Sequence, residues 1–336
     1  MKRTMKCHEG SAKDRGEHMV DRPLLLLTND DGLEAIGMRL LVQSLHAIDA
    51  FDIVVVAPRR NQSATGMRLN LMTPLPLRRR NDLIDTWNLK HPDRINLFDL
   101  DGTPCDCMIV ALDGGLDFLI EGGRPTMVVS GVNLGPNMSQ DCLHSGTMGA
   151  ARESSMYGVP SIASSLTVFE DTDMQVAVDA TVQAILQILP TLPLQARNLG
   201  RNEHNPQPWH WGGSTVIEND MLKEAFYDGD LYLNLNIPPD WNGQWKTTRF
   251  GIRWYRNAVA FDGNENESNA TFTIGASKIE KTDVERGDCD AVELSFASIS
   301  SLGTWPQNHP LSLSEHTLTY AYEVHHEFPD WIMSMD

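Results

Sequence analysis

The stretch LLLLTNDDGLEA, from Leu24 to Ala35, places two adjacent carboxylates, Asp30 and Asp31, shortly after four leucines. An apolar run of this kind is typical of a strand buried on both faces, and the pattern after Gly32 favours a helix. Neighbouring anions repel, and removing them from water is costly unless a cation or hydrogen-bond donors compensate. A helix N-cap would account for one aspartate. The pair therefore leaves two interpretations open, an N-cap and a metal site.

Apolar runs and helical patterns alternate along the first 190 residues. Besides the run at 24–27, strands are expected at 51–57, 126–130 and 161–164, and helices at 37–46, 148–157 and 175–189. Continuous apolar strands that alternate with helices predict a mostly parallel sheet covered by helices on both sides. The expected fold class is therefore α/β, with three layers.

The character of the chain changes beyond residue 195. The stretch NLGRNEHNPQPWHWGGS (198–214) is polar and loop-like, and strand candidates follow it at 231–237, 250–255, 271–274 and 292–300. We therefore expect three parts: a disordered N-terminal tail over 1–21, an α/β core over 22–195, and a β-rich C-terminal extension over 196–336 with β-hairpins.

Composition excludes several classes of protein. The 336 residues, 41% hydrophobic and 21% charged, are typical of a globular chain. No apolar run approaches the roughly 18–20 residues that cross a bilayer, and the first 21 residues resemble no signal peptide, so we expect no membrane partner. The net charge of −18 argues against binding to a nucleic-acid polymer. Five cysteines without framework or zinc spacing favour reduced thiols and a cytoplasmic protein.

Polar and glycine residues gather after three of the expected strands, where ligands bind in an open parallel sheet. These residues are Asn29, Asp30, Asp31 and Gly32; then Asn61, Ser63, Thr65 and Gly66; and then Ser130, Asn133, Asn137, His144, Ser145, Gly146 and Thr147. Two carboxylates with Ser and Asn oxygens suit Mg²⁺ or Mn²⁺, and HSGT (144–147) at a helix start suits a phosphate. Taken singly, Asn133 would fit a turn and Ser145 or Thr147 an N-cap. Together they predict metal-assisted phosphoryl hydrolysis.

A rival signal lies in LFDLDGTPCD (97–106). DLDGT resembles the first motif of haloacid dehalogenase-like phosphatases, in which Asp99 would be the nucleophile and Asp101 the acid/base. Here the motif follows HPDRIN (91–96) deep in the chain, and no later Lys or acidic pair completes the set. This chemistry is kept as an alternative.

Four segments together resemble the SurE family of 5′(3′)-nucleotidases, also known as stationary-phase survival proteins. They are LLLLTNDDGLEAIGMRLL (24–41), VVVAPRRNQSATGMRLNL (54–71), DGTPCDCMIVAL (101–112) and VVSGVNLGPNMSQDCLHSGTMGAARESSMYGVPSIASS (128–165). LYLNLNIPP (231–239) and GDCDAVELSFASISSL (287–302) are similar to later segments of the family. The resemblance also accounts for DGTPCDC, which weakens the dehalogenase interpretation.

The resemblance implies a Rossmann-like core, a C-terminal extension that often drives dimer or tetramer formation, and hydrolysis of nucleoside monophosphates, sometimes also of short polyphosphate. It implies one divalent cation per subunit, Mg²⁺ or Mn²⁺, held by Asp30, Asp31, Ser63 and Asn133. It implies a phosphate contacted by Asn137 and by Ser145, Gly146 and Thr147. Asn29 joins this substrate set as a residue that supports the loop.

The chain departs from the family pattern at several positions. Arg59 stands where the family usually has Asp, Ser154 stands where Gly is usual, SISSL (298–302) replaces the usual closing sequence, and the span 197–226 is longer than the norm. The four metal ligands are retained.

The attacking group stays open at this point. A water activated by the cation, or Asp30 or Asp31 itself, could attack phosphorus, with Ser130 and Asn137 polarising the phosphate. His144 fits either a general acid or a packed surface histidine. A protein that binds metal and nucleotide without turnover is a further alternative.

Overall fold

The computed structural model describes residues 22–120, 123–201, 218–262, 270–275, 278–324 and 326–333. The expected tail, 1–21, and most of the long span 197–226 lie outside these ranges. Within them, no helix combines the length and the apolarity needed to cross a bilayer.

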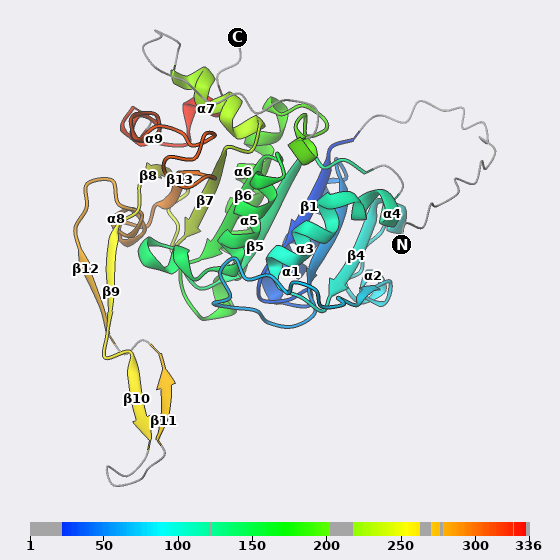
Figure 1. The fold of residues 1–336 in the computed structure, drawn as a ribbon, viewed down its shortest axis with the longest axis horizontal. Coiled ribbons are helices and arrows are strands. Elements are labelled where there is room, and N and C mark those ends of the chain that lie inside the picture. The colour runs from blue at the N-terminus through cyan, green and yellow to red at the C-terminus, as the bar shows by residue number, and fades with distance from the viewer. Residues whose placement is uncertain are drawn as a thin grey trace, which may run out of the picture.

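A nine-stranded sheet forms the centre of the molecule, in the order β3-β4-β2-β1-β5-β6-β7-β13-β8 (Figure 1). Six neighbouring strands, from β4 to β7, run parallel, whereas β3 is antiparallel to β4 and β13 is antiparallel to β7. The strands are β1 (Leu24–Thr28), β2 (Asp52–Pro58), β3 (Leu77–Arg79), β4 (Ile95–Leu100), β5 (Met127–Leu134), β6 (Ser161–Leu166), β7 (Leu231–Ile237), β8 (Trp245–Thr248) and β13 (Ala297–Gly303).

Helices cover both faces of this sheet. The helices are α1 (Ile36–Ile48), α2 (Asp82–Thr86), α3 (Pro104–Val110), α4 (Leu116–Ile120), α5 (Gly146–Met156), α6 (Met174–Ile188), α7 (Glu218–Tyr227), α8 (Asp288–Glu293), α9 (Glu315–Glu323) and α10 (Asp330–Met333). Leu25 and Leu27 of β1 belong to the apolar core beneath α1 and α6, whereas Leu24 and Leu26 belong to the core that includes residues of α3 and α5. The alternation confirms the expected three-layer α/β fold, because successive side chains of a strand point to opposite faces.

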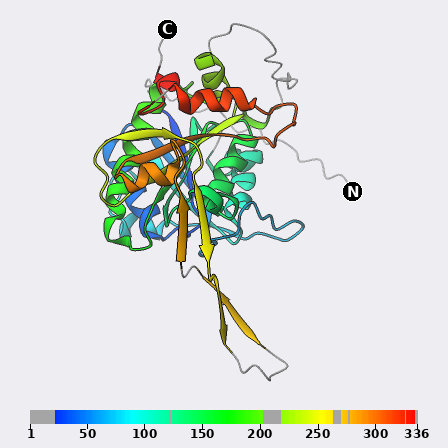
Figure 2. The ribbon, with the colours of Figure 1, turned by 90° about the vertical axis from the view of Figure 1, so that its left-hand side faces the viewer.

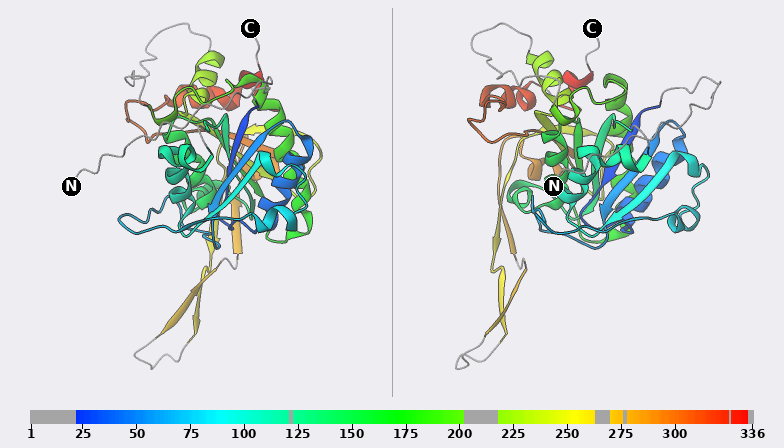
Figure 3. Two further views of the ribbon diagram at one scale, coloured as in Figure 1. Left: turned by 90° about the vertical axis from the view of Figure 1, so that its right-hand side faces the viewer. Right: turned by 45° about the vertical axis from the view of Figure 1, so that its right-hand side comes forward.

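An arm extends from the C-terminal half. It consists of β9 (Ile252–Arg256) paired with β12 (Lys278–Thr282), followed by β10 (Val259–Asp262) paired with β11 (Thr271–Ile274). All views show this arm projecting away from the sheet, with β10 and β11 farthest out (Figures 2 and 3). Its strands confirm the β-rich extension.

The structure differs from the sequence prediction in the bounds of one strand and in elements that were not expected. The strand expected over 292–300 is wrong at its start, because α8 ends at Glu293 and the strand begins only at Ala297. Ser295 between them takes a positive φ of 60°, which forms a turn. The sequence analysis also did not predict β3 or β4, although β4 contains Asp99. The proposed division at residue 195 stays a prediction.

We expect Trp331→Ala to lower the stability of the whole sheet by about 3–5 kcal/mol. Trp331 is fully buried against Phe226 and shares one apolar core with β1 and β5. Chemical unfolding followed by circular dichroism should show one transition that shifts as a unit. Trp254→Ala, at a half-exposed arm residue, is the control and should shift it little. A second transition moving alone would instead support a separate C-terminal domain.

Candidate metal and phosphate site

The expected site lies at the carboxyl ends of three adjacent strands. β1 is flanked by β2 and β5, and each of these strands leads into one of the loops that the sequence analysis singled out. This edge is where open parallel sheets bind ligands.

Asp30 meets the N-terminus of α5. The Thr147 hydroxyl donates to Asp30 Oδ1 at 2.7 Å, and the Thr147 N–H donates to Oδ2 at 3.1 Å. Ser145 caps this helix by accepting from the Met148 N–H at 3.0 Å. At Gly146 an added Cβ would lie 2.8 Å from the Cβ of Asp30, so only glycine allows this approach. The predicted phosphate loop and the predicted metal carboxylate are therefore in direct contact.

Asp31 joins the other two loops. Its Oδ2 accepts from the Leu134 N–H at 3.0 Å, and its Oδ1 accepts from Asn61 Nδ2 at 3.2 Å. The Ser63 side chain lies close enough to this carboxylate to lower its pKa. The structure thus brings Asp31, Ser63 and the end of β5 together, although they lie far apart in sequence.

A bulge aims Asn133 at this edge. The register between β5 and β6 shifts between Ser130 and Asn133, and Gly131 within the shift has a φ of +141°. An added Cβ at Gly131 would lie 2.4 Å from the carbonyl oxygen of Ser164. Asn133 Nδ2 donates to the Gly135 carbonyl at 2.8 Å, and no described residue bonds to its Oδ1. Bulges commonly re-aim side chains in this way, and here the amide oxygen stays available to a ligand.

The electrostatics of the two aspartates favour a cation. Burial, then the neighbouring Asp31, raise the pKa of Asp30 from its usual value of 3.8 to about 6, despite the bonds from Thr147. Burial also raises the pKa of Asp31, against the bonds from Leu134, Ser63 and Asn61. The hydrogen bonds to the two carboxylates come from neutral hydroxyl, amide and backbone N–H groups, which do not balance the two negative charges. Among the described residues, no group of three or more His, Cys, Asp or Glu side chains is arranged to hold a metal ion, so a cation here would rely on Ser and Asn oxygens as well.

Three further expected residues have well-defined surroundings. Asn29 is fully buried, and its side chain both donates to and accepts from the backbone of Gly32, so it builds the turn after β1. Ser130 is fully buried in β5. His144 is exposed, and its carbonyl accepts from the Gly66 N–H at 2.8 Å, which joins the second and third loops.

Asn137 is held by a buried amide network that the sequence analysis missed. Its carbonyl accepts from Asn234 Nδ2 at 2.9 Å and from Asn236 Nδ2 at 3.1 Å, and its N–H donates to Asn236 Oδ1 at 2.8 Å. Its own Nδ2 donates to Ser165 Oγ at 2.7 Å. The signal was present in LYLNLNI, where two amides lie in a run that is otherwise apolar or aromatic. Contact of Asn137 with a phosphate stays a prediction.

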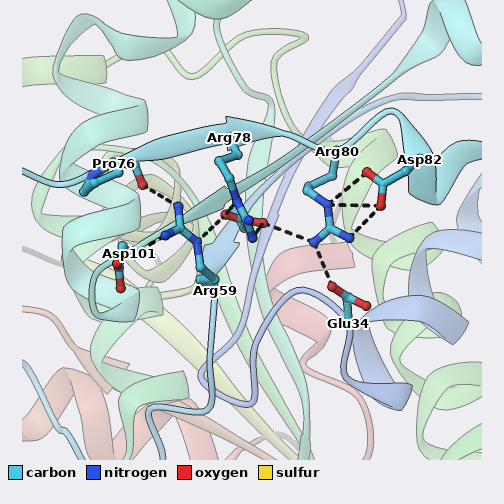
Figure 4. Close-up of polar contacts among 8 residues, drawn as sticks. Glu34, Arg59, Pro76, Arg78, Arg80, Asp82 and Asp101 are labelled. Atoms are coloured by element: carbon cyan, nitrogen blue, oxygen red, sulfur yellow. Dashed lines mark hydrogen bonds and ion pairs between the residues drawn. The ribbon is translucent and has the colours of Figure 1, made fainter.

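The rival site is accounted for by structure. The Asp99 carboxylate accepts hydrogen bonds from Arg59, Arg78 and Arg80, the three arginines that Figure 4 labels. Its side chain is buried. Thr103 of the same motif caps α3 in a reciprocal capping box with Asp106. A carboxylate held by three guanidinium groups is a poor nucleophile, so the dehalogenase alternative does not fit.

Known proteins identify the family. The family model described as "Survival protein SurE" matches residues 25–257, which contain every expected ligand. The chain belongs to the SurE family. It is 30% identical over 270 residues to "5′-nucleotidase SurE" of Anaeromyxobacter dehalogenans (strain 2CP-C), covering 80% of this chain and 85% of that protein. It is 33% identical over 283 residues to the protein of the same name from Sorangium cellulosum (strain So ce56), covering 84% and 90%.

A solved SurE structure agrees with this assignment. The crystal structure of SurE from Aquifex aeolicus aligns with a TM-score of 0.61 and 28% identity, over 85% of this chain and 95% of that one. The resemblance to SurE proteins and the Rossmann-like core are thereby confirmed.

We expect Asp30→Asn to stabilise the metal-free protein at pH 7.5 by up to about 3 kcal/mol, the equivalent of about two pKa units. The native carboxyl has the higher pKa, so ionisation costs native stability above pH 6, and the cost disappears near pH 4 where the unfolded carboxyl is protonated too. The gain should therefore fade as the pH falls from 6 to 4. Urea unfolding in EDTA across this range measures it.

Asp99→Asn is the control, and it should change the free energy of unfolding in the opposite direction. Three arginines lower the pKa of Asp99 to about 2 in spite of its burial, so Asp99→Asn should destabilise the protein at pH 7.5. An Asp30→Asn protein that is less stable than wild type throughout this pH range would contradict the assigned environment of Asp30.

Proposed function

We propose that this chain is a metal-dependent phosphomonoesterase that removes phosphate from nucleoside 5′- and 3′-monophosphates. The observation that carries the proposal is the buried Asp30 carboxylate beside Asp31, set against the N-terminus of α5. Anionic ligands bind at helix N-termini, and paired carboxylates attract a divalent cation. The relatives described above carry the name 5′-nucleotidase, which matches this chemistry.

The proposed metal ligands are Asp30, Asp31, Ser63 and Asn133. All four offer oxygen, and the set carries two negative charges, which suits Mg²⁺ or Mn²⁺ better than a metal that prefers sulfur or imidazole. A bound cation would neutralise the charge that develops on the oxygens of the reacting phosphate, and it would lower the pKa of a nearby water.

The chain itself orients the reacting groups in this proposal. Ser145, Gly146 and Thr147 put the positive end of α5 against the phosphate, and Asn29 and Asn137 fix the two loops beside it. Both oxygens of Asp30 already accept from Thr147, and both oxygens of Asp31 accept from other groups. Their remaining lone pairs would be directed to the cation in this proposal, which favours water over either aspartate as the nucleophile.

We expect Asp31→Asn to lower kcat/KM for AMP with Mn²⁺ by at least about 100-fold, since even outer-shell partners of metal ligands are worth 10–100-fold. The measurement is phosphate release from AMP with and without Mn²⁺. Asp117→Asn, at an exposed position of α4, is the matched control and should behave as wild type. A wild-type protein that binds AMP and Mn²⁺ but releases no phosphate would indicate a sensor in place of an enzyme.

We further propose that the chain assembles with copies of itself, as a homodimer or homotetramer, through the arm. Val259 and Phe261 of β10 pair with Ile274 and Phe272 of β11, and all four side chains are about half exposed or more. A two-stranded ribbon is only marginally stable by itself in water, and a cluster of exposed apolar side chains is typical of an interface. A second arm supplies a surface of matching chemistry.

The double substitution Phe261→Ser and Phe272→Ser should reduce the molar mass in light scattering to that of one chain, because it removes the pair of aromatic rings in contact at the arm. Phe118→Ser, at an exposed phenylalanine of α4, is the control and should leave the mass unchanged. A wild-type protein of single-chain mass would contradict the proposal.

We propose a reducing compartment, the cytoplasm. Cys105, Cys107, Cys142 and Cys289 are all free thiols, and three of them are buried.

A further inference from the structure

A single buried carboxylate binds three arginines beside the proposed active site. Arg59 Nε and Arg78 Nε donate to Asp99 Oδ1, both at 2.9 Å, whereas Arg78 NH2 and Arg80 NH1 donate to Oδ2 at 2.7 and 3.1 Å (Figure 4). The Asp99 side chain is only 1% exposed. Neither the phosphatase chemistry nor the α3 cap uses this cluster, which we name the Asp99 hub: Asp99 with Arg59, Arg78 and Arg80.

Arg59 ties the second ligand loop to the hub. It follows β2 directly and begins the loop that carries Asn61 and Ser63. Its other two guanidinium nitrogens donate to Asp101 at 3.2 Å and to the Pro76 carbonyl at 3.1 Å. The start of the loop is therefore fixed in three directions.

Arg80 ties the first ligand loop to the same carboxylate. Its NH1 reaches both Asp99 and Glu34, the latter at 2.7 Å, and its NH2 donates to Asp82 at 2.7 Å. Glu34 lies three residues after Asp31, in the turn that leads into α1. In contrast, Arg78 lies on the edge strand β3, and its hydrogen bonds go to Asp99 alone.

The charges make the hub a permanent ionic junction. Burial raises the pKa of Asp99, but hydrogen bonds from Arg78, Arg59 and Arg80 outweigh it and hold the pKa at about 2. The carboxylate is therefore ionised at every pH at which the protein works, and the arginines are always charged. Loss of this one anion would leave three neighbouring cations to repel one another and release both loops.

We propose that Asp99 is a positioning residue which, through Arg59 and Arg80, sets the spacing of the two loops that carry Asp30, Asp31 and Ser63. The inference rests on the proposed function, because it concerns the same metal site. Asp99 touches no substrate atom; it acts by holding the ligand loops at a distance that suits a divalent cation.

The test is the binding of Mn²⁺ alone, measured by calorimetry, together with kcat and KM for AMP. We expect Asp99→Asn and Arg59→Met each to weaken Mn²⁺ binding about tenfold, the scale of effects from residues behind a metal ligand. Saturating Mn²⁺ should restore much of kcat. Arg78→Met removes an equal charge from the hub but no link to a ligand loop, so its Mn²⁺ affinity should stay within about twofold of wild type.

Two further variants separate positioning from general stability. Asp230→Asn breaks another buried ion pair, with Arg201 at 3.0 Å, at the amino end of β7, and should leave Mn²⁺ affinity unchanged. If Asp99→Asn does not fold, Arg59→Lys is the variant to use. It keeps the positive charge but cannot make the three contacts of the guanidinium group with Asp99, Asp101 and Pro76, so it should weaken Mn²⁺ binding severalfold. If wild type, Asp99→Asn and the Arg59 variants bind Mn²⁺ equally well, the positioning role is overturned but the metal site is not. The same conclusion follows if Arg78→Met and Asp230→Asn lose as much Mn²⁺ affinity as Asp99→Asn. A wild-type protein that binds no Mn²⁺ would overturn the proposed metal site as well.

Discussion

The repulsion between Asp30 and Asp31 is the constraint on which the site depends. Two carboxylates at the end of a buried strand need donors, and no single neighbouring segment supplies enough. Thr147 donates from α5, Leu134 from β5 and Asn61 from the loop after β2. Because these donors belong to three connections of the sheet, the pair can be held only when β2, β1 and β5 lie side by side in parallel.

Close backbone approach is the second requirement. α5 can present its first turn to Asp30 only because residue 146 has no side chain, and Asn133 reaches the same edge only because Gly131 permits the bulge. Both glycines lie within GVNLGPN or HSGT, the stretches that stood out in the sequence as loops after a strand. The glycines in these stretches allow backbone segments to come close, whereas the oxygen-bearing side chains are the candidate ligands.

The sequence predicted the elements whose signal is local. Four leucines before Asn29 and the run at 51–57 indicate buried strands, since alternation of hydrophobic and polar side chains is absent there. β3 and β4 were missed because β3 has only three residues and β4 carries a buried carboxylate, Asp99, whose charge neighbouring arginines balance. The Asn137 network was missed for a similar reason: the partners of buried amides come from segments about 100 residues away, and no spacing rule predicts such pairs. The prediction of loops that meet at one sheet edge succeeded because topology alone brings strand ends together.

Asp30 and Asp99 show how surroundings divide the tasks of one residue type. Both are buried aspartates, and burial raises the pKa of each. Asp99 has three guanidinium groups, and its pKa falls to about 2; Asp30 has hydroxyl and N–H donors and a second anion, and its pKa rises to about 6. A carboxylate that is already surrounded by cations is not stabilised further by a metal ion, whereas a buried carboxylate without a neighbouring cation is stabilised strongly. The same comparison explains why the DLDGT motif gives a structural junction and the NDD motif a candidate metal site.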